Sequence, residues 1–292
     1  MTREEINSLL YDYPEVYRPP FEAESALLEV THGCSYGKCF FCDFARDEYF
    51  PFELEDIERK IKLLSHVIDG NDRLYFLGSN PFCLPSKRIL TIIDLVHKYL
   101  PCVNEISMYA RADDINRKPW SDMMELKHAG LTDLHVGLES GSDRILKLHN
   151  KGETVFDIQK ALDTLASCEI GYNLTAILGM GGRDLSYEHA VKTAMLFNML
   201  TPISIWCMAL KIWPNTPLYY LAENGGFIQM TPLEILREER HMLGLMDMKK
   251  GCIYVDSTVL NKYTLSARLP HSKDSALENL DRLIAEQERE DM

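Results

Sequence analysis

The stretch ALLEVTHGCSYGKCFFCDF, residues 26–44, contains the most informative motif of the chain. It begins with an apolar run that predicts a strand and continues into a loop with three closely spaced cysteines, Cys34, Cys39 and Cys42. Cysteine thiolates bind zinc ions and iron–sulfur clusters in proteins. The loop therefore predicts a metal site with three protein ligands.

The spacing C-x4-C-x2-C favours an iron–sulfur cluster over zinc. Structural zinc sites usually have four ligands in two separated pairs, and only Cys39 and Cys42 form such a pair here. Gly33 and Gly37 permit the backbone turns that direct several thiolates toward one centre. Three thiolates leave one iron of a cluster without a protein ligand, and that iron is open to chemistry. A zinc-stabilised binding protein is the alternative.

Composition and charge argue against several other classes of protein. The chain has 292 residues, of which 46% are hydrophobic and 26% charged, as in a globular protein of one barrel-like domain or two smaller ones. We see no secretory leader and no apolar run near the roughly 20 residues that span a bilayer, so we expect a soluble, cytoplasmic protein without disulfides. A net charge of −13 disfavours nonspecific binding to nucleic acid or to an anionic membrane.

Short apolar runs alternate with helical patterns along most of the chain. Such a βα series predicts an α/β fold, with a parallel sheet that is covered by helices. The six predicted strands are Ala26–Thr31, Arg73–Leu77, Glu105–Arg111, Asp133–Glu139, Tyr172–Leu178 and Ser204–Lys211. We expect an N-terminal extension over residues 1–23, a core domain over 24–235 and a C-terminal extension over 236–292, which ends in a packing helix from about Ser272.

Several of these strands carry polar residues on one face. In Glu105–Arg111, the period of two places Ser107, Tyr109 and Arg111 together, opposite a face that is wholly apolar. A parallel sheet that is buried on both faces would be almost continuously apolar. The polar face therefore predicts the lining of a barrel that holds a polar ligand, with the active site at the carboxyl ends of the strands.

Taken in order, these motifs resemble the radical S-adenosylmethionine superfamily. Besides the cysteine loop, Gly78-Ser79-Asn80 follows the second strand, where the family often has a Gly-Gly-Glu-like stretch. The segments LESGS (residues 138–142) and HNKG (149–152) resemble one branch, which contains oxygen-independent coproporphyrinogen oxidases, Elongator-type catalytic subunits and methylthiotransferases. The resemblance covers most of the chain and implies a partial (β/α)6 TIM-type barrel with parallel strands.

The resemblance also implies an enzyme with two cofactors. Cys34, Cys39 and Cys42 would hold a 4Fe–4S cluster, and the open iron would bind S-adenosylmethionine. Reductive cleavage of S-adenosylmethionine would give methionine and a 5′-deoxyadenosyl radical, which takes a hydrogen atom from the substrate.

Contacts to S-adenosylmethionine are implied where this sequence matches the family's motifs. Ser79 and Asn80 match the segment that binds the methionyl amine, and Lys151 matches a basic residue that contacts the methionyl carboxylate. Arg111 and Glu139 lie at strand ends where the family has polar contacts to the ribose and the methionyl group. The alternatives are that Arg111 and Glu139 pair with each other, and that Lys151 is a solvated charge at a helix start.

Two further positions match segments near the adenine. Phe41, before the last cysteine, resembles a residue whose backbone lies near the base, and Gly179 belongs to a glycine-containing strand end, ILGMGG (177–182). The chain departs from the family's commonest pattern in two places. One extra residue separates the first two cysteines, and Asn80 replaces the more usual acidic residue, although an amide oxygen can still accept from an amine.

The substrate is not identified by these motifs. We expect a small molecule, a flavodoxin- or ferredoxin-type electron donor, and no nucleic-acid partner; the oligomeric state is left open. Cys252 and Tyr254 are candidates for donating a hydrogen atom to a product radical. The alternatives are an iron–sulfur electron-transfer or regulatory protein that has lost turnover, and a radical oxidase that acts on tetrapyrroles.

Overall fold

The computed structural model describes residues 3–12, 16–43, 47–68, 70–257 and 262–291. The chain forms two compact units. The first unit comprises residues 1–37, 44–136 and 160–172, and the second comprises residues 38–43, 137–159 and 173–292. The cysteine loop therefore begins in the first unit, which contains Cys34, and continues in the second, which contains Cys39 and Cys42.

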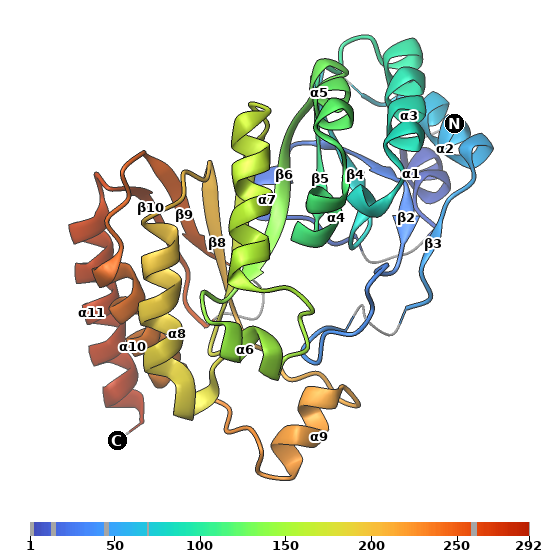
Figure 1. The fold of residues 1–292 in the computed structure, drawn as a ribbon. Helices are drawn as coiled ribbons and strands as arrows, with labels where there is room; N and C mark the ends of the chain where they lie inside the picture. Colours follow the sequence, from blue (N-terminus) through green and yellow to red (C-terminus); the bar gives the residue numbers. More distant parts are fainter. Residues whose placement is uncertain (1–2, 13–15, 44–46, 69, 258–261, 292) are drawn as a thin grey trace. The chain divides into compact units, whose positions relative to one another are not determined.

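Four parallel strands form the sheet of the first unit, in the order β1-β4-β5-β6 (Figure 1). They are β1 (Ala26–Glu29), β4 (Arg73–Leu77), β5 (Glu105–Ala110) and β6 (Leu131–Glu139), the last three residues of which belong to the second unit. Phe76 of β4 pairs with Leu28 of β1 and with Met108 of β5. The carboxyl ends of these strands therefore meet at one edge of the sheet.

Helices and short elements complete the first unit. They are α1 (Arg3–Leu10), η1 (Pro20–Glu22), β2 (Thr31–His32), β3 (Phe50–Pro51), α2 (Leu54–Leu64), η3 (Pro81–Cys83), α3 (Ser86–Tyr99), α4 (Ala112–Arg117) and α5 (Trp120–His128). Ile57, Ile61 and Leu64 are buried on one face of α2, as their spacing predicts. The apolar face of α3 is buried in the same way.

The second unit contains three parallel strands and one antiparallel strand, in the order β7-β8-β9-β10. They are β7 (Gly171–Leu178), β8 (Ser204–Ala209), β9 (Cys252–Asp256) and β10 (Leu265–Leu269). The helices that begin in this unit are α6 (Asp143–Leu148), α7 (Val155–Ser167), α8 (Gly182–Phe197), α9 (Pro217–Glu223), α10 (Pro232–Leu245) and α11 (Lys273–Glu290). Figure 1 shows α10 beside α8 and α11.

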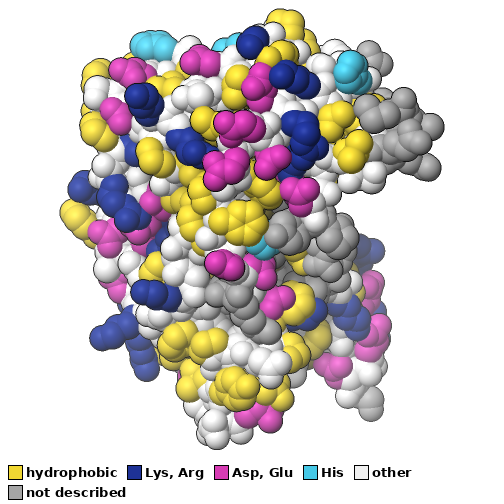
Figure 2. All heavy atoms as spheres, turned by 90° about the vertical axis from the view of Figure 1, so that its right-hand side faces the viewer, with side chains coloured by type: hydrophobic (Ala, Val, Ile, Leu, Met, Phe, Trp, Pro, Cys, Tyr) yellow, Lys and Arg dark blue, Asp and Glu magenta, His cyan; other side chains and the backbone are white. Residues whose placement is uncertain are grey.

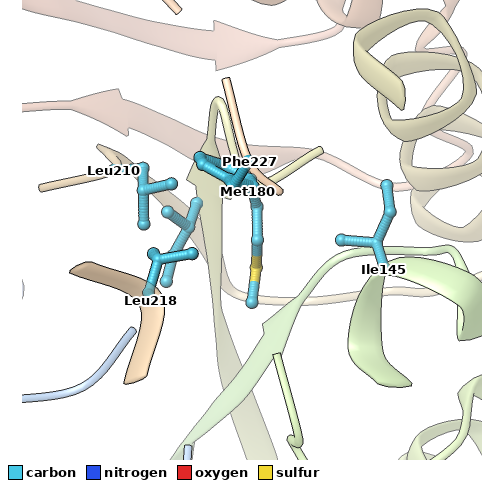
Figure 3. Packing of buried hydrophobic residues seen from close by; sticks show 6 residues of the cluster. Ile145, Met180, Leu210, Leu218 and Phe227 are labelled. Atoms are coloured by element: carbon cyan, nitrogen blue, oxygen red, sulfur yellow. The ribbon is translucent and has the colours of Figure 1, made fainter. Parts of the chain in front are cut away.

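A buried apolar cluster joins α6, the turn after β7 and the segment around α9 (Figure 3). Its members are Ile145, Ile177, Met180, Leu210, Leu218 and Phe227. Phe40 and Phe41 of the cysteine loop pack against this cluster as partly buried side chains. The burial of these rings attaches the second half of the loop to the second unit.

The predicted α/β class and the six predicted strands are confirmed, with shifts of one or two residues at several ends. The C-terminal helix is also confirmed as α11. The sequence patterns did not identify β9 and β10, which lie within the expected C-terminal extension. The boundaries of that extension and of the core domain stay predictions.

Acidic and basic side chains are interspersed on the face that Figure 2 shows. The figure shows no large area of a single charge among the described residues of that face. No helix in the described part of the chain has both the length and the apolar character needed to cross a membrane.

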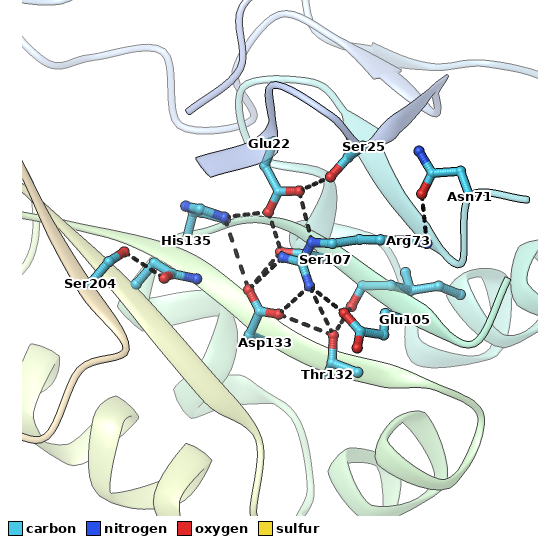
Figure 4. Close-up of polar contacts among 12 residues, drawn as sticks. Glu22, Ser25, Asn71, Arg73, Glu105, Ser107, Thr132, Asp133, His135 and Ser204 are labelled. Carbon is cyan, nitrogen blue, oxygen red and sulfur yellow. Dashed lines mark hydrogen bonds and ion pairs between the residues drawn. The ribbon is translucent and has the colours of Figure 1, made fainter. Parts of the chain in front are cut away.

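Buried charges connect the N-terminal extension to the sheet of the first unit (Figure 4). Arg73, the first residue of β4, donates to Glu22 of η1, with Nε–Oε2 at 2.9 Å, and to Asp133 of β6, with Nη1–Oδ2 at 2.8 Å. Ser107 donates to Asp133 at 3.0 Å, and His135 is bonded to Glu22 at 2.8 Å. The polar face predicted for β5 therefore contacts charged neighbours at the amino-terminal end of the strands.

The network holds Glu22 in its charged form. Burial would raise the pKa of Glu22, but hydrogen bonds from His135, Arg73 and Ser25 outweigh it and lower the pKa to about 2. Ligand atoms of Glu22, Asp133 and His135 lie within 4.8 Å of one another, which is a spacing that suits a metal ion. Because Arg73 donates to both carboxylates, its guanidinium already neutralises them, and we infer no cation here.

We predict that Glu22 contributes stability that is lost in acid. A carboxyl with a lowered folded-state pKa stabilises the protein above its unfolded value of 4.5, and this contribution disappears as the pH falls toward 2. Glu22→Gln should be less stable than wild type by roughly 3 kcal/mol at pH 7, because one charge of a buried pair is removed. Urea unfolding of both proteins between pH 7 and pH 3 should show this difference shrinking below pH 5. A difference that stays constant would contradict the assignment.

Candidate functional site

The three predicted cluster ligands lie between β2 and β3. Cys39 is buried, and Cys34 and Cys42 are half-buried. All three thiols are free of disulfide bonds. Cysteine thiols at this spacing are the donor set that iron–sulfur clusters use, so the residues present fit such a group.

The start of the loop requires glycine. Gly33 has a φ of +64° and Gly37 a φ of +58°, values that side-chain-bearing residues rarely adopt. A Cβ at Gly33 would lie 2.7 Å from the backbone oxygen of Glu48, which is closer than real Cβ contacts. The chain therefore enters the cysteine loop through a turn that only glycine fits.

Asn80 holds the first half of the loop from the end of β4. Its side chain is completely buried, and Nδ2 donates to Ser35 Oγ at 2.8 Å and to Asp114 Oδ2 at 2.7 Å. Its Oδ1 accepts from the backbone N–H of Arg111 at 3.2 Å. The residue predicted to bind the methionyl amine thus also connects the loop to the end of β5. Ser79, beside it, is half-buried.

Arg111 contacts Tyr36, the residue that follows Ser35 in the cysteine loop. Its guanidinium lies 4.0 Å from the centre of the Tyr36 ring, a cation–π contact. Its Nε donates to Asp113 at 3.1 Å, and the residue is only 6% exposed. In the first unit, the structure therefore brings two predicted residues, Asn80 and Arg111, to the beginning of the cysteine loop.

Backbone hydrogen bonds hold the second half of the loop in the second unit. The N–H of Phe40 donates to the carbonyl of His149 at 2.9 Å, and the Phe40 carbonyl accepts from Leu218 at 3.1 Å. Asn150 Nδ2 donates to the carbonyl of Lys38 at 2.9 Å. The Phe41 ring meets the imidazole of His149 edge-on, with the ring centres 5.7 Å apart.

Glu139 and Lys151 form a buried ion pair in the second unit. Lys151 Nζ lies 3.0 Å from Glu139 Oε1, and Thr175 donates to Glu139 Oε2 at 3.3 Å. The predicted alternative of a solvated Lys151 is wrong, because the residue is 5% exposed. Glu139 also has a φ of +60°, and such strain in a residue other than glycine often marks a functional site.

The absence of a side chain at Gly137 leaves space for this ion pair. A Cβ at this position would lie 2.2 Å from Glu139 Oε1 and 2.9 Å from Lys151 Nζ. A glycine two residues before the strand end is therefore needed for the two side chains to meet.

Gly179 follows β7 with a φ of +80°, and its N–H donates to Glu238 Oε1 of α10 at 2.6 Å. Burial raises the pKa of Glu238 to about 7, although hydrogen bonds from Ser186 and Gly179 act in the opposite direction. The glycine turn that was predicted to pass near adenine is thus attached to a buried carboxyl group.

The two candidate hydrogen-atom donors are buried in β9. The hydroxyl of Tyr254 donates to Glu239 of α10 at 2.8 Å, and burial raises the pKa of Cys252 to about 11. Both therefore carry their protons at neutral pH. Their role as donors stays a prediction.

Sequence reasoning missed several partners of the site residues. They are Tyr36, which contacts Arg111, Asp114, which accepts from Asn80, His149 and Leu218, which bond to the Phe40 backbone, and Glu238, which accepts from Gly179. Leu218 acts through its backbone, which carries no sequence signal, and the others join positions that are far apart in the chain. Tyr36 and His149 lie in segments that the motifs singled out.

A family model described as "Radical SAM superfamily" matches residues 28–197, which is more than half of the chain. This chain belongs to the radical SAM superfamily. The family uses a 4Fe–4S cluster and S-adenosylmethionine, so the prediction of these two cofactors is confirmed.

Similar proteins include members of the predicted branch. A heme chaperone, HemW of Bacillus subtilis, is 23% identical over an alignment of 209 positions that covers 67% of this chain and 51% of that protein. A tRNA-2-methylthio-N(6)-dimethylallyladenosine synthase of Hahella chejuensis is 26% identical over an alignment of 237 positions that covers 73% of this chain and 50% of the synthase. The chain thus spans about half the length of these curated relatives.

Methylornithine synthase (PylB) resembles this chain along nearly its whole length. Its crystal structure matches with a TM-score of 0.56 at 14% identity, covering 99% of this chain and 93% of the synthase. A likeness at this identity concerns the fold, and it confirms the predicted partial TIM-type barrel class.

We predict that Gly33→Ala impairs the cysteine loop more than a matched change elsewhere. Gly70 has a similar φ of +67° but nothing within 4 Å of an added Cβ, so Gly70→Ala should cost only backbone strain, about 1–2 kcal/mol. Gly33→Ala adds the clash with Glu48 and should also lower the iron bound per chain after anaerobic reconstitution. Thermal unfolding and iron analysis compare the two variants. Equal iron contents would show that Gly33 has no special role.

Proposed function

We propose that this chain is a radical S-adenosylmethionine enzyme that abstracts a hydrogen atom from a small-molecule substrate. The observation that carries the proposal is the loop with the thiols of Cys34, Cys39 and Cys42, in which residues on either side of Gly37 are fixed by hydrogen bonds. Cys34, Cys39 and Cys42 would hold a 4Fe–4S cluster, which would supply an iron open to S-adenosylmethionine and would pass on an electron from an external reductant for its cleavage to methionine and a 5′-deoxyadenosyl radical.

The first unit supplies groups for the methionyl part. Ser79 and Asn80 would accept from the amine, since Asn80 Oδ1 accepts one hydrogen bond already and can accept a second. Arg111 would provide positive charge for the methionyl group. Its contacts with Tyr36 and Asp113 support this role, because they orient the guanidinium before the ligand binds.

The second unit supplies groups for the carboxylate, the ribose and the base. Lys151 would pair with the methionyl carboxylate, and Glu139 would accept from the ribose hydroxyls. Their mutual ion pair supports these roles, because each buried group has a partner of opposite sign until a ligand takes over one of the contacts. Backbone atoms of Phe41 and Gly179 would lie along the adenine, where glycine permits close approach.

The proposal of a small substrate is supported by the polar face of the first unit, because the protein's own side chains fill much of it. The rings of Tyr75, Tyr109 and His135 contact one another edge-on, with centres 5.6–5.8 Å apart. Tyr11 and Val16 of the N-terminal extension pack against the apolar part of the same cluster. Side chains of the protein itself thus occupy much of this face. The electron donor proposed for the reaction is a flavodoxin- or ferredoxin-type protein.

We expect the reconstituted protein to form 5′-deoxyadenosine from S-adenosylmethionine under dithionite and without oxygen. Cys39→Ala should reduce this to background, because it removes a cluster ligand, whereas Cys102→Ala changes an exposed cysteine and should behave as wild type. Chromatographic assay of 5′-deoxyadenosine makes the comparison. Absence of the product from wild type that has its full iron content would favour an electron-transfer protein. Bound zinc and no iron would favour the zinc-stabilised alternative.

We further expect Lys151→Met to weaken binding of S-adenosylmethionine to the reconstituted protein roughly 10- to 100-fold, the range that a lost charge-assisted hydrogen bond gives. Lys192→Met is the matched control, because Lys192 forms a comparable ion pair with Glu188 at 2.8 Å but is half exposed. Equilibrium dialysis measures the affinity, and iron analysis checks that both variants keep the cluster. Equal affinities of the two variants would remove Lys151 from the proposed site.

A further inference from the structure

His149 follows α6 in the second unit and is completely buried. Neither the chemistry of the cluster nor the contacts proposed for S-adenosylmethionine give it a role. Yet it touches two segments that were predicted independently to lie near the adenine: the loop residues Phe40 and Phe41, and the turn at Met180.

The contacts of His149 use different parts of the residue. Its backbone carbonyl accepts from the Phe40 N–H at 2.9 Å, so the main chain holds the loop. Its ring meets Phe41 and Phe227 edge-on, with centres 5.7 Å away in each case. Its Nε2 lies 2.6 Å from the carbonyl oxygen of Met180.

The hydrogen bond to Met180 fixes the state of the imidazole. A carbonyl oxygen only accepts, so Nε2 carries the hydrogen. Burial lowers the pKa of His149 to about 4, against the opposing effect of this bond, so the ring is neutral at physiological pH. Nδ1 has no hydrogen-bond partner among the described residues.

Most of the ring contacts of His149 could be made by any aromatic side chain, and one hydrogen bond could not. A phenylalanine would fill the same space between the aromatic neighbours and would avoid the cost of the buried, unbonded Nδ1. Only the Nε2–H donor to Met180 requires histidine. The side chain of His149 therefore connects Phe41, which its ring contacts, to the turn at Met180, to which its Nε2–H is hydrogen-bonded.

We propose that His149 is a positioning residue that aligns the Phe40–Phe41 segment with the turn at Met180, so that the two form one preorganised edge for the adenine end of S-adenosylmethionine. The inference rests on the proposed function. His149 acts through the backbone of these segments and holds neither the cluster nor the methionyl group. Loss of the Nε2–H donor therefore weakens binding of S-adenosylmethionine and leaves cluster assembly intact.

The test uses two variants of the full chain after anaerobic reconstitution. His149→Phe keeps a ring and removes the donor, and it should raise the Kd of S-adenosylmethionine roughly 10-fold, as loss of a supporting hydrogen bond does at other sites. His149→Gln keeps an N–H donor at similar reach and should recover part of the affinity. Both variants should contain as much iron per chain as wild type.

His135→Phe is the matched control. It also removes a buried imidazole with a hydrogen bond through Nε2, but in the first unit and to Glu22. It should lower the unfolding temperature without changing the Kd of S-adenosylmethionine. Hydrogen–deuterium exchange of residues 177–182 adds a measurement that needs no bound cofactor, and exchange there should be faster in His149→Phe than in His135→Phe, because only His149→Phe removes the hydrogen bond to Met180.

Several outcomes would overturn the proposal. One is a wild-type Kd in His149→Phe, and another is a loss of iron as complete as in Cys39→Ala, which would make His149 part of cluster binding. If His149→Gln is as weak as His149→Phe, the donor is not the important atom. If wild type itself binds no S-adenosylmethionine, the proposal fails together with the proposed function; if wild type binds it and forms 5′-deoxyadenosine, only the role of His149 is at stake.

Discussion

The hydrogen bonds that hold the cysteine loop are the constraint on which the candidate site depends. The loop has no regular secondary structure around Cys34, Cys39 and Cys42, so its shape is not fixed by its own backbone pattern. A metal cluster needs thiolates in defined positions, and preorganisation lowers the cost of binding it. Contacts from outside the loop therefore decide whether three nearby cysteines become a site.

The two halves of the loop are held by different kinds of contact. In the first unit, polar side chains at the ends of β4 and β5 contact Ser35 and Tyr36. In the second unit, backbone hydrogen bonds hold Phe40, while its ring and that of Phe41 are packed against an apolar cluster. Side-chain hydrogen bonds are directional and sensitive to substitution, whereas backbone bonds tolerate it. Changes at Asn80 should therefore affect the loop more than changes at Leu218.

Local patterns were sufficient to predict six strands of the sheet. Alternation along residues 105–111 identified a polar face, and that face contacts Asp133 through Ser107. Strand β9 was missed because its interior side chains include the polar groups of Tyr254 and Asp256, which do not resemble a buried strand. These groups are tolerated inside because Glu239 of α10 provides a hydrogen-bonding partner.

The contacts that hold the site residues in place were not predictable, because they join residues far apart in the sequence. Asn80 reaches Ser35 across 45 residues of sequence, and His149 reaches Phe40 across more than 100, and no spacing rule connects such pairs. The predicted contacts at Glu139 and Lys151 came from a family resemblance, which names positions but not their partners. The structure adds the ion pair between these two residues and the glycine, Gly137, that leaves room for it.

The proposed function requires that a cluster held by Cys34, Cys39 and Cys42 has one iron open to S-adenosylmethionine. The most direct measurement is the electron paramagnetic resonance spectrum of the dithionite-reduced, reconstituted protein before and after addition of S-adenosylmethionine. We predict a 4Fe–4S signal whose g values and line shape change when S-adenosylmethionine is added, because its amine and carboxylate replace the solvent at one iron. Identical spectra with and without saturating S-adenosylmethionine would contradict the account.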